Sequence, residues 1–449
     1  MKKKKIVLIS SISTLFLVVI IILSIFIFNS SRYYKYNGKI YEDSYDYKNK
    51  YGYQYLEKTD GRLAKIYEDV YLMATDFSHK NQDVDKKERD TLFFEESFNT
   101  TTFTERDFYR VYSYFNADNP KFYWFASFVD EDRTTGSFGI HKTYIKGKSR
   151  KKFNKIVDEG VKKVDELVEG LENEYDIIKT LNDYIVSNMH YAYDHGIIAS
   201  DEEWAHNIIG FFDKNSGVCE TYTKVFKLFC DRYNIGNIAL YSESHIWNIA
   251  LCDGFWYVFD LTFDEGQYTY FGMTESYLDD GDHEHDEVLY ELPENMAKAP
   301  LSLGLIELKE NGKTICSSHS IDYILSKLND GNYEIILNDT DTKVTNFYID
   351  ELNSKYNALT INTTQDEKNK VRIIFDKDIS LTKDLTLKNM TLYGKNDMKI
   401  KTNEATLYVK DIYLSSVELE GNIQYLDEWK ITQKIICLLG FHFLLQSLP

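Results

Sequence analysis

The stretch SHIWNIALCDGFWYVFDLT, residues 244–262, contains two runs of aromatic and β-branched side chains separated by Asp253-Gly254. An Asp-Gly pair between two such runs is a strong signal for a β-hairpin, because both residues tolerate the positive φ angles of a tight turn. We therefore expect two antiparallel strands here, as part of the sheet of an α+β protein.

The register of this hairpin decides which side chains meet. If Cys252 pairs with Phe255, Asp260 lies two residues from the position opposite His245, and both side chains project from one face of the sheet. Such diagonal neighbours have Cβ atoms somewhat under ~7–8 Å apart, a gap that an aspartate and an imidazole can bridge with a hydrogen bond. The inference depends on the turn, since a turn with an odd number of residues would place them on opposite faces.

An amphipathic helix is predicted directly upstream, in TYTKVFKLFCDRY, residues 221–233. Tyr222, Phe226 and Phe229 recur at helical spacing and mark one buried face. Cys219 therefore lies at or just before the first turn of this helix. The N–H groups and partial positive charge of a helix N-terminus favour a thiolate and can face an oxyanion that forms beside the sulfur.

These local predictions assign one chemical part to each of three residues. Cys219 is the candidate nucleophile, His245 the candidate base, and Asp260 the group that orients the base. Taken singly, each has an ordinary structural explanation, because a lone cysteine is more often buried than reactive. One packing reason would not explain all three together.

The same residues resemble the transglutaminase-like superfamily of papain-like cysteine enzymes. The resemblance rests on GVCETYTKVFKLFCDRYNI (217–235), on the His-x-Trp-Asn and Trp-Tyr-x-x-Asp-x-Thr patterns of the hairpin, and on YFGMTESYL (270–278). EYDIIKTLNDYIVSNMHY (174–191) and ADNPKFYWF (117–125) are similar to segments that precede the core in bacterial members.

The resemblance implies a Cys-bearing helix packed on an antiparallel sheet, with Cys219, His245 and Asp260 as the catalytic triad. It implies attack on an amide, an acyl-enzyme, and transfer of the acyl group to water or to an amine, on protein or cell-wall peptides. Thr221 and Ile246 depart from the family pattern beside the catalytic positions, where they could narrow the cleft. The alternative is therefore a degenerate module that binds such ligands without catalysis.

Composition narrows the function classes. The chain of 449 residues has a formal net charge of −19, which argues against nucleic acid as a partner. Aromatic residues make up 15% of it, too many for a disordered protein. Its five cysteines are an odd, scattered set and form no disulfide framework. We expect no cofactor, and the sequence carries no prediction of oligomeric state.

The N-terminus predicts a membrane anchor. MKKKK is followed by an uncharged apolar run of residues 6–28, long enough to cross a bilayer and without a clear signal-peptidase site. We expect an uncleaved single-pass anchor with the bulk of the chain extracytoplasmic, as in bacterial surface members of the family, and a cleaved signal peptide as the alternative.

The organisation along the chain is predicted in five parts. Each part differs from its neighbours in composition or periodicity: an anchor (1–28), a Tyr- and Lys-rich tether (29–60), an N-terminal α+β domain (61–165), the transglutaminase-like core (166–300) and a β-rich C-terminal module (301–449). In the last part, Leu385 and Leu407 belong to two similar strand units offset by 22 residues, which suggests a small β-solenoid.

A second group of histidines lies in GDHEHDE, residues 281–287. Imidazole and carboxylate suit several divalent ions, but a His-x-His pair in a loop lacks defined ligand geometry. We therefore predict that His283 and His285 belong to a solvated loop and that the protein holds no metal.

Overall fold

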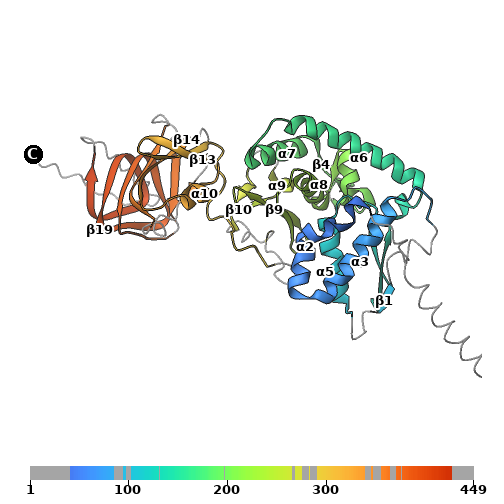
Figure 1. Ribbon diagram of the computed structural model, residues 1–449. Helices are drawn as coiled ribbons and strands as arrows, with labels where there is room; N and C mark the ends of the chain where they lie inside the picture. Colours follow the sequence, from blue (N-terminus) through green and yellow to red (C-terminus); the bar gives the residue numbers. More distant parts are fainter. Residues whose placement is uncertain are drawn as a thin grey trace, which may run out of the picture.

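The computed structural model describes residues 41–84, 95–97, 103–130, 132–196, 198–264, 268–275, 283, 291–338, 345–346, 355–364, 371–375 and 377–426. It is a mixed α+β structure. A body of helices packed on short sheets lies to the right in Figure 1, and the strands from β12 onward form a second body to the left.

The helices of the first body surround its sheets. They are η1 (Glu42–Asn49), α2 (Tyr51–Thr59), α3 (Gly61–Ser78), α5 (Glu105–Asp118), η2 (Lys142–Tyr144), α6 (Gly147–Val168), α7 (Glu174–Asn188), η3 (Glu203–His206), η4 (Gly210–Lys214), α8 (Cys219–Arg232) and α9 (Leu261–Asp264). Its strands are β1 (Glu95–Ser97), β2 (Phe125–Val129), β3 (Thr135–Ile140), β4 (His190–Tyr191), β5 (Tyr193–Asp194), β6 (Ile198–Ala199), β7 (Ser216–Gly217), β8 (Asn237–Tyr241), β9 (Ile246–Cys252), β10 (Phe255–Phe259) and β11 (Phe271–Met273).

The central sheet has the order β11-β10-β9-β8, and all its neighbouring strands are antiparallel. Cys252 pairs with Phe255, as the hairpin prediction required, and the ladder continues to Phe259 opposite Asn248. The turn residue Asp253 has a φ of 51° and Gly254 a φ of 83°, the positive values expected of this two-residue turn. Asp260 directly follows β10, so α9 begins where the ladder ends.

Helix α8 packs on β8 and β9 and begins at Cys219, the residue predicted to open it. Tyr222, Phe226 and Phe229 are buried, as their helical spacing predicted. Thr221, Lys224 and Lys227 are buried as well. The helix is therefore covered on more than one side, which a single apolar stripe does not indicate.

The N-terminal part of the described chain differs from the prediction of an irregular tether. η1 and α2 fall within residues 29–60 and pack against α3. Tyr47 is 3% exposed and Leu56 is fully buried. The tyrosines of this segment make aromatic contacts, such as that of Tyr47 with Tyr71. They therefore pack in a segment whose composition predicted solvent exposure.

The predicted boundary at residue 165 does not divide two cores. Helix α6 runs through it without interruption, and one buried cluster extends from Tyr47 to Leu301. A second buried cluster extends from Ala299 to Ile412. In the sequence, the first cluster ends at Leu301 and the second begins at Ala299.

The C-terminal module is mostly parallel. Its elements are β12 (Leu305–Glu310), β13 (Lys313–Ser318), α10 (Ile321–Ser326), β14 (Gly331–Asn338), β15 (Thr345–Asn346), β16 (Tyr356–Thr363), β17 (Val371–Phe375), β18 (Ile379–Leu381) and β19 (Asp384–Tyr425). β14, β16 and β19 are successive parallel neighbours, and β17 and β18 also pair with β19 in parallel. The Thr406 backbone N–H donates to Asp384 Oδ1, 22 residues earlier, and Leu385 and Leu407 are both buried.

The prediction of a single-pass membrane protein is corrected by the helices. None of those in the described residues is both long and apolar enough to cross a membrane. The 22-residue helix α6 illustrates the reason, since its lysines and acidic residues leave only a narrow buried stripe that includes Val164 and Val168. Residues 6–28, on which the prediction rested, lie outside the described residues.

Candidate active site

Cys219 is positioned by the segment that precedes α8. Asn215 has a φ of 53°, and Ser216 and Gly217 then form a short parallel pairing with His190 and Tyr191. Val218 adopts an extended conformation as the N-cap, so the first helical residue is Cys219 itself. Its thiol therefore lies on the first turn of α8, where the backbone N–H groups have no partner within the helix.

Thr221 faces away from this thiol. Its hydroxyl donates to the carbonyl oxygens of Ala205, at 2.5 Å, and Asn207, at 3.2 Å. The side chain is fully buried, and a Cβ added to Gly217 would lie 2.4 Å from the Thr221 Cβ. The hydrogen bonds of Thr221 thus connect the start of α8 to the preceding segment. Its side chain packs against Gly217, which has no Cβ, rather than into the cleft.

Ile246, the other departure from the family pattern, does contact the candidate nucleophile. It is 2% exposed and forms a small cluster with Ala117 and Ala239, against which Cys219 and Tyr241 pack. One wall beside the thiol is therefore apolar. Cys219 itself remains partly exposed.

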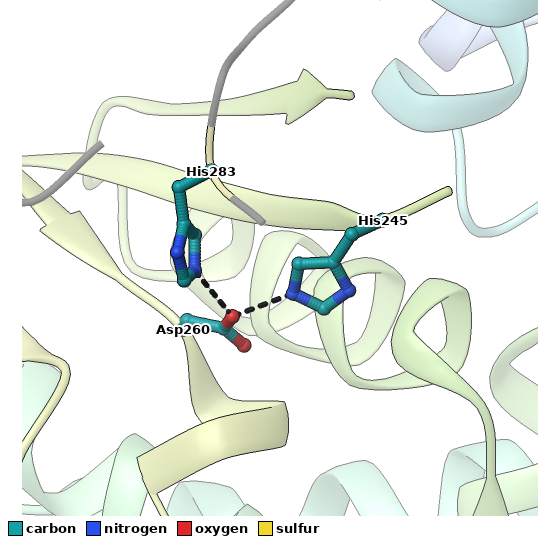
Figure 2. Close-up of side chains that lie close together, drawn as sticks. All are labelled: His245, Asp260 and His283. Carbon is teal, nitrogen blue, oxygen red and sulfur yellow. Dashed lines mark hydrogen bonds and ion pairs between the residues drawn. The ribbon is translucent and has the colours of Figure 1, made fainter. Parts of the chain in front are cut away.

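His245 and Asp260 meet at the end of the hairpin. His245 Nε2 lies 2.6 Å from Asp260 Oδ2, and the two side chains are 9% and 1% exposed. Figure 2 shows the imidazole of His245 directed at the carboxylate. The contact was expected from diagonal neighbours in the ladder, but Asp260 reaches it from the turn into α9, just beyond the last ladder pair.

The Asp260 carboxylate is held on both oxygens. Oδ1 accepts the backbone N–H of Thr262 at 2.9 Å, and a longer contact of 3.4 Å comes from the Phe263 N–H. Burial alone would raise the pKa of Asp260, but hydrogen bonds from His245 and His283 outweigh it and hold the pKa at about 2. Asp260 is therefore ionised throughout the neutral range.

His245 is held as a cation at neutral pH. Burial disfavours the charged ring, but hydrogen bonds with Asp260 and then with Cys219 raise the pKa of His245 to about 9. Because Nε2 is engaged by Asp260, Nδ1 is the nitrogen left for the Cys219 side. An imidazole between a thiol and a carboxylate can take the thiol proton, which gives a thiolate beside an imidazolium.

Tyr191 borders the same sulfur from another strand. Its hydroxyl accepts a hydrogen bond from the backbone N–H of Cys219, and burial followed by the Cys219 charge raises the pKa of Tyr191 to about 12. The pairing of β4 with β7 places Tyr191 opposite Gly217, which lies two residues before Cys219. Its phenol therefore remains a proton donor at neutral pH.

His283 is the residue that sequence reasoning missed. It was predicted to lie in a solvated loop, yet it is 1% exposed and its Nε2 lies 2.9 Å from Asp260 Oδ2. Figure 2 shows it approaching the carboxylate from the side away from His245. The only sequence signal was a histidine close after the hairpin, and nothing in its spacing indicated a partner. His285 lies outside the described residues.

Among the residues that the structure describes, these three side chains are the group whose donor atoms lie close enough to share a metal ion. His245 Nε2, Asp260 Oδ2 and His283 Nε2 all lie within 4.8 Å of one another. The two nitrogens are nevertheless only 2.6 and 2.9 Å from the same oxygen. Donor atoms that share a tetrahedral ion at about 2.0–2.2 Å each stand farther apart than this, so the spacing fits direct hydrogen bonds.

A polar cavity of about 210 Å³ adjoins the first turn of α8. Its lining includes Glu220, Lys224 and His206. Burial raises the pKa of Glu220, but Lys224 and His206 together hold it at about 2. His206 is fully engaged, with Nδ1 2.6 Å from Glu220 and Nε2 2.9 Å from the Ser200 carbonyl oxygen, so its role here is structural.

No protein-family model and no curated protein matches this chain. A transglutaminase is among the similar solved structures. That crystal structure has 9% sequence identity and a TM-score of 0.24, with 31% of this chain matching 44% of the other. A candidate cysteine protease from Cytophaga hutchinsonii has 21% identity and a TM-score of 0.19, with 24% of this chain matching 37% of the other. The chain thus matches less than half of either protein, and scores this low carry no argument about the site.

Proposed function

We propose that the protein is a cysteine enzyme that acts on amide bonds of proteins or peptides through Cys219, His245 and Asp260. The observation that carries the proposal is the contact of 2.6 Å between His245 Nε2 and Asp260 Oδ2, beside the thiol at the start of α8. A sheet histidine with only a packing role has no need of a buried, ionised carboxylate and a neighbouring thiol.

The proposed reaction begins when the Cys219 sulfur, as a thiolate paired with the His245 imidazolium, attacks the carbonyl carbon of an amide. The carbonyl oxygen becomes an oxyanion, to which the Tyr191 hydroxyl can donate while its own oxygen accepts the Cys219 backbone N–H. Collapse of this intermediate breaks the C–N bond, and His245 gives its proton to the leaving amine. The product is a thioester on Cys219.

The second half regenerates the thiol. Water or an amine attacks the thioester carbon, and His245, now neutral, takes a proton from the incoming nucleophile. The C–S bond breaks, which releases an acid or a new amide and restores the pair of thiolate and imidazolium. Hydrolysis and acyl transfer therefore use the same residues, and the acceptor decides which product forms.

The test uses the full chain, wild type and Cys219→Ala, incubated with peptide mixtures and a labelled primary amine. We expect products that depend on Cys219, and mass spectrometry separates cleaved peptides from peptides that carry the amine. His206→Gln is the matched control, because its imidazole contacts Glu220 and Ser200 and plays no part in the reaction. Absence of any Cys219-dependent product across the mixtures would favour the binding module instead.

A further inference from the structure

His283 occupies a position that the three-residue reaction does not require. Its imidazole is 1% exposed, and Nε2 lies 2.9 Å from Asp260 Oδ2, the same oxygen that binds His245 Nε2 at 2.6 Å. A buried carboxylate with one imidazole partner would already orient the base. The second imidazole therefore calls for an explanation of its own.

The ring of His283 is held by aromatic neighbours. It stacks on Tyr270, with ring centroids 5.2 Å apart and an interplanar angle of 28°. The edge contacts are with Trp247, at 4.9 Å, and Phe263, at 5.7 Å. Trp247 and Phe263 also stack on His245, at 5.7 and 4.8 Å. One aromatic enclosure thus fixes the orientation of both imidazoles.

The carboxylate between them has donors on every side. Oδ1 faces the backbone N–H groups of Thr262 and Phe263, and Oδ2 faces the two imidazoles. Because Asp260 is ionised, each imidazole must present its Nε2–H to Oδ2 as a donor. The backbone donors hold only Oδ1, and His283 gives Oδ2 a second donor, so the position of Oδ2 does not depend on His245 alone.

We propose that His283 is a positioning residue, which donates its Nε2–H to Asp260 and fixes the carboxylate so that His245 keeps Nδ1 directed at Cys219. The inference rests on the proposed function, since it assigns a role within the same site. It makes the orienting unit a pair, Asp260 with His283, rather than a single aspartate.

The first test measures the rate constant for alkylation of Cys219 by iodoacetamide at pH 7, in the full chain, with the labelled residue identified by mass spectrometry. His283→Phe keeps an aromatic ring among Trp247, Phe263 and Tyr270 but removes the donor, and we expect a loss of about 10-fold through misplacement of the base. His283→Gln restores an N–H donor, and we expect it to recover most of the rate. Thermal melting of each variant checks the fold.

The matched control is His319→Phe, which also replaces an imidazole bonded to an oxygen but lies outside the site, where the ring is half-buried. We expect its alkylation rate to equal that of the wild type. An unchanged rate in His283→Phe, or an equal loss in His283→Phe and His283→Gln with the fold intact, would overturn the positioning role.

The second test separates this inference from the proposed function. Imidazole N–H protons bonded to a carboxylate give downfield proton resonances, and we expect two in the wild type. His283→Phe should remove one and shift the other, whereas His245→Phe should remove only the other. If wild-type Cys219 reacts no faster than it does in His245→Phe, the proposed enzyme fails, while the two resonances still decide whether His283 holds Asp260. A single resonance in the wild type would refute the contact itself.

Discussion

At the scale of the residue, His245 is the group whose charge state governs the site. Burial opposes its charge, and Asp260 and Cys219 together raise its pKa to about 9. We predict that Asp260→Asn lowers the pKa of His245 by more than one unit, because the largest favourable contribution is removed while burial remains. An NMR titration of the imidazole C–H protons measures the change. A pKa that stays near 9 in the variant would contradict this account.

The same shift sets a direction for the stability of the fold. Because the pKa of His245 is raised in the folded state, the stability that its charged ring contributes is fully present below the ordinary pKa of about 6.5. This contribution is lost as pH rises through about 9. We predict that the wild type is more stable to urea than His245→Gln at pH 6 and that the difference shrinks by pH 10. Denaturation curves at the two pH values test this, and a difference that grows with pH would contradict it.

The role of the Tyr191 hydroxyl can be tested by replacing the tyrosine with phenylalanine. If its hydroxyl faces the oxyanion, Tyr191→Phe should lower kcat by roughly 10²–10³-fold with little change in KM, because the donor acts mainly in the transition state. If the hydroxyl instead only covers the Cys219 N–H, the variant should be as active as the wild type or more active. The comparison uses whichever peptide gives a Cys219-dependent product.

Particular residues show how far sequence reasoning reaches at this scale. The place of Cys219 at the start of α8 and the contact of His245 with Asp260 were predictable because a helix start and a two-residue turn fix these positions locally. His283 was misjudged because its contact with Asp260 depends on the path of the chain beyond β11, which no periodicity records. Tyr191 was overlooked for a similar reason, since only a two-residue parallel pairing brings it beside Cys219.

At the scale of the element, α8 must start at a fixed place for Cys219 to face His245. Thr221 fastens that start through its hydroxyl, which donates to the Ala205 and Asn207 carbonyl oxygens. We predict that Thr221→Val lowers the free energy of unfolding by about 1–3 kcal/mol, because it leaves buried carbonyl groups without this donor. Urea denaturation measures the loss.

Thr221→Ser is the control for this element, because it keeps the hydroxyl and removes only a methyl group. It should cost less than Thr221→Val, which keeps the volume and loses the hydrogen bonds. The reverse order would mean that packing against Gly217, rather than hydrogen bonding, holds the helix start.

The hairpin and the helix α8 were predictable because their signals lie within about twenty residues. The packed η1 and α2 were not, because tyrosine and lysine spacing there resembles a tether until Tyr47, Leu56 and α3 are brought together. The buried cluster that joins residues on both sides of α6 is likewise a property of tertiary packing.

At the scale of the whole molecule, His319 makes one of the contacts between the C-terminal module and the first body. Its ring stacks on Tyr175 at 3.5 Å, and Nδ1 lies 2.9 Å from the Ser302 carbonyl oxygen. Burial lowers the pKa of His319, against the opposing charges of Asp176 and Asp253. Because the pKa of His319 is lower in the folded state, the stability that its neutral ring contributes is fully present above the ordinary pKa of about 6.5. This contribution is lost as pH falls below that value.

We therefore predict that the contact between the two bodies weakens in acid. Scanning calorimetry of the full chain should show one merged unfolding transition at pH 7.5 and a greater separation of two transitions at pH 5. His319→Phe keeps a ring against Tyr175 and lacks the titrating nitrogen. The temperature difference between its two unfolding transitions should therefore depend less on pH. Identical pH dependence in both proteins would contradict a role for His319.

The β9–β10 hairpin lies between the C-terminal module and the candidate site. At its turn, Asp253 accepts a hydrogen bond from Ser318 of the C-terminal module, and Tyr257 and Ser320 contact each other through hydroxyls 2.5 Å apart. His245 and Asp260 flank the opposite end of the same ladder. One hairpin is therefore hydrogen-bonded to the C-terminal module at its turn and carries His245 and Asp260 at the other end of its ladder.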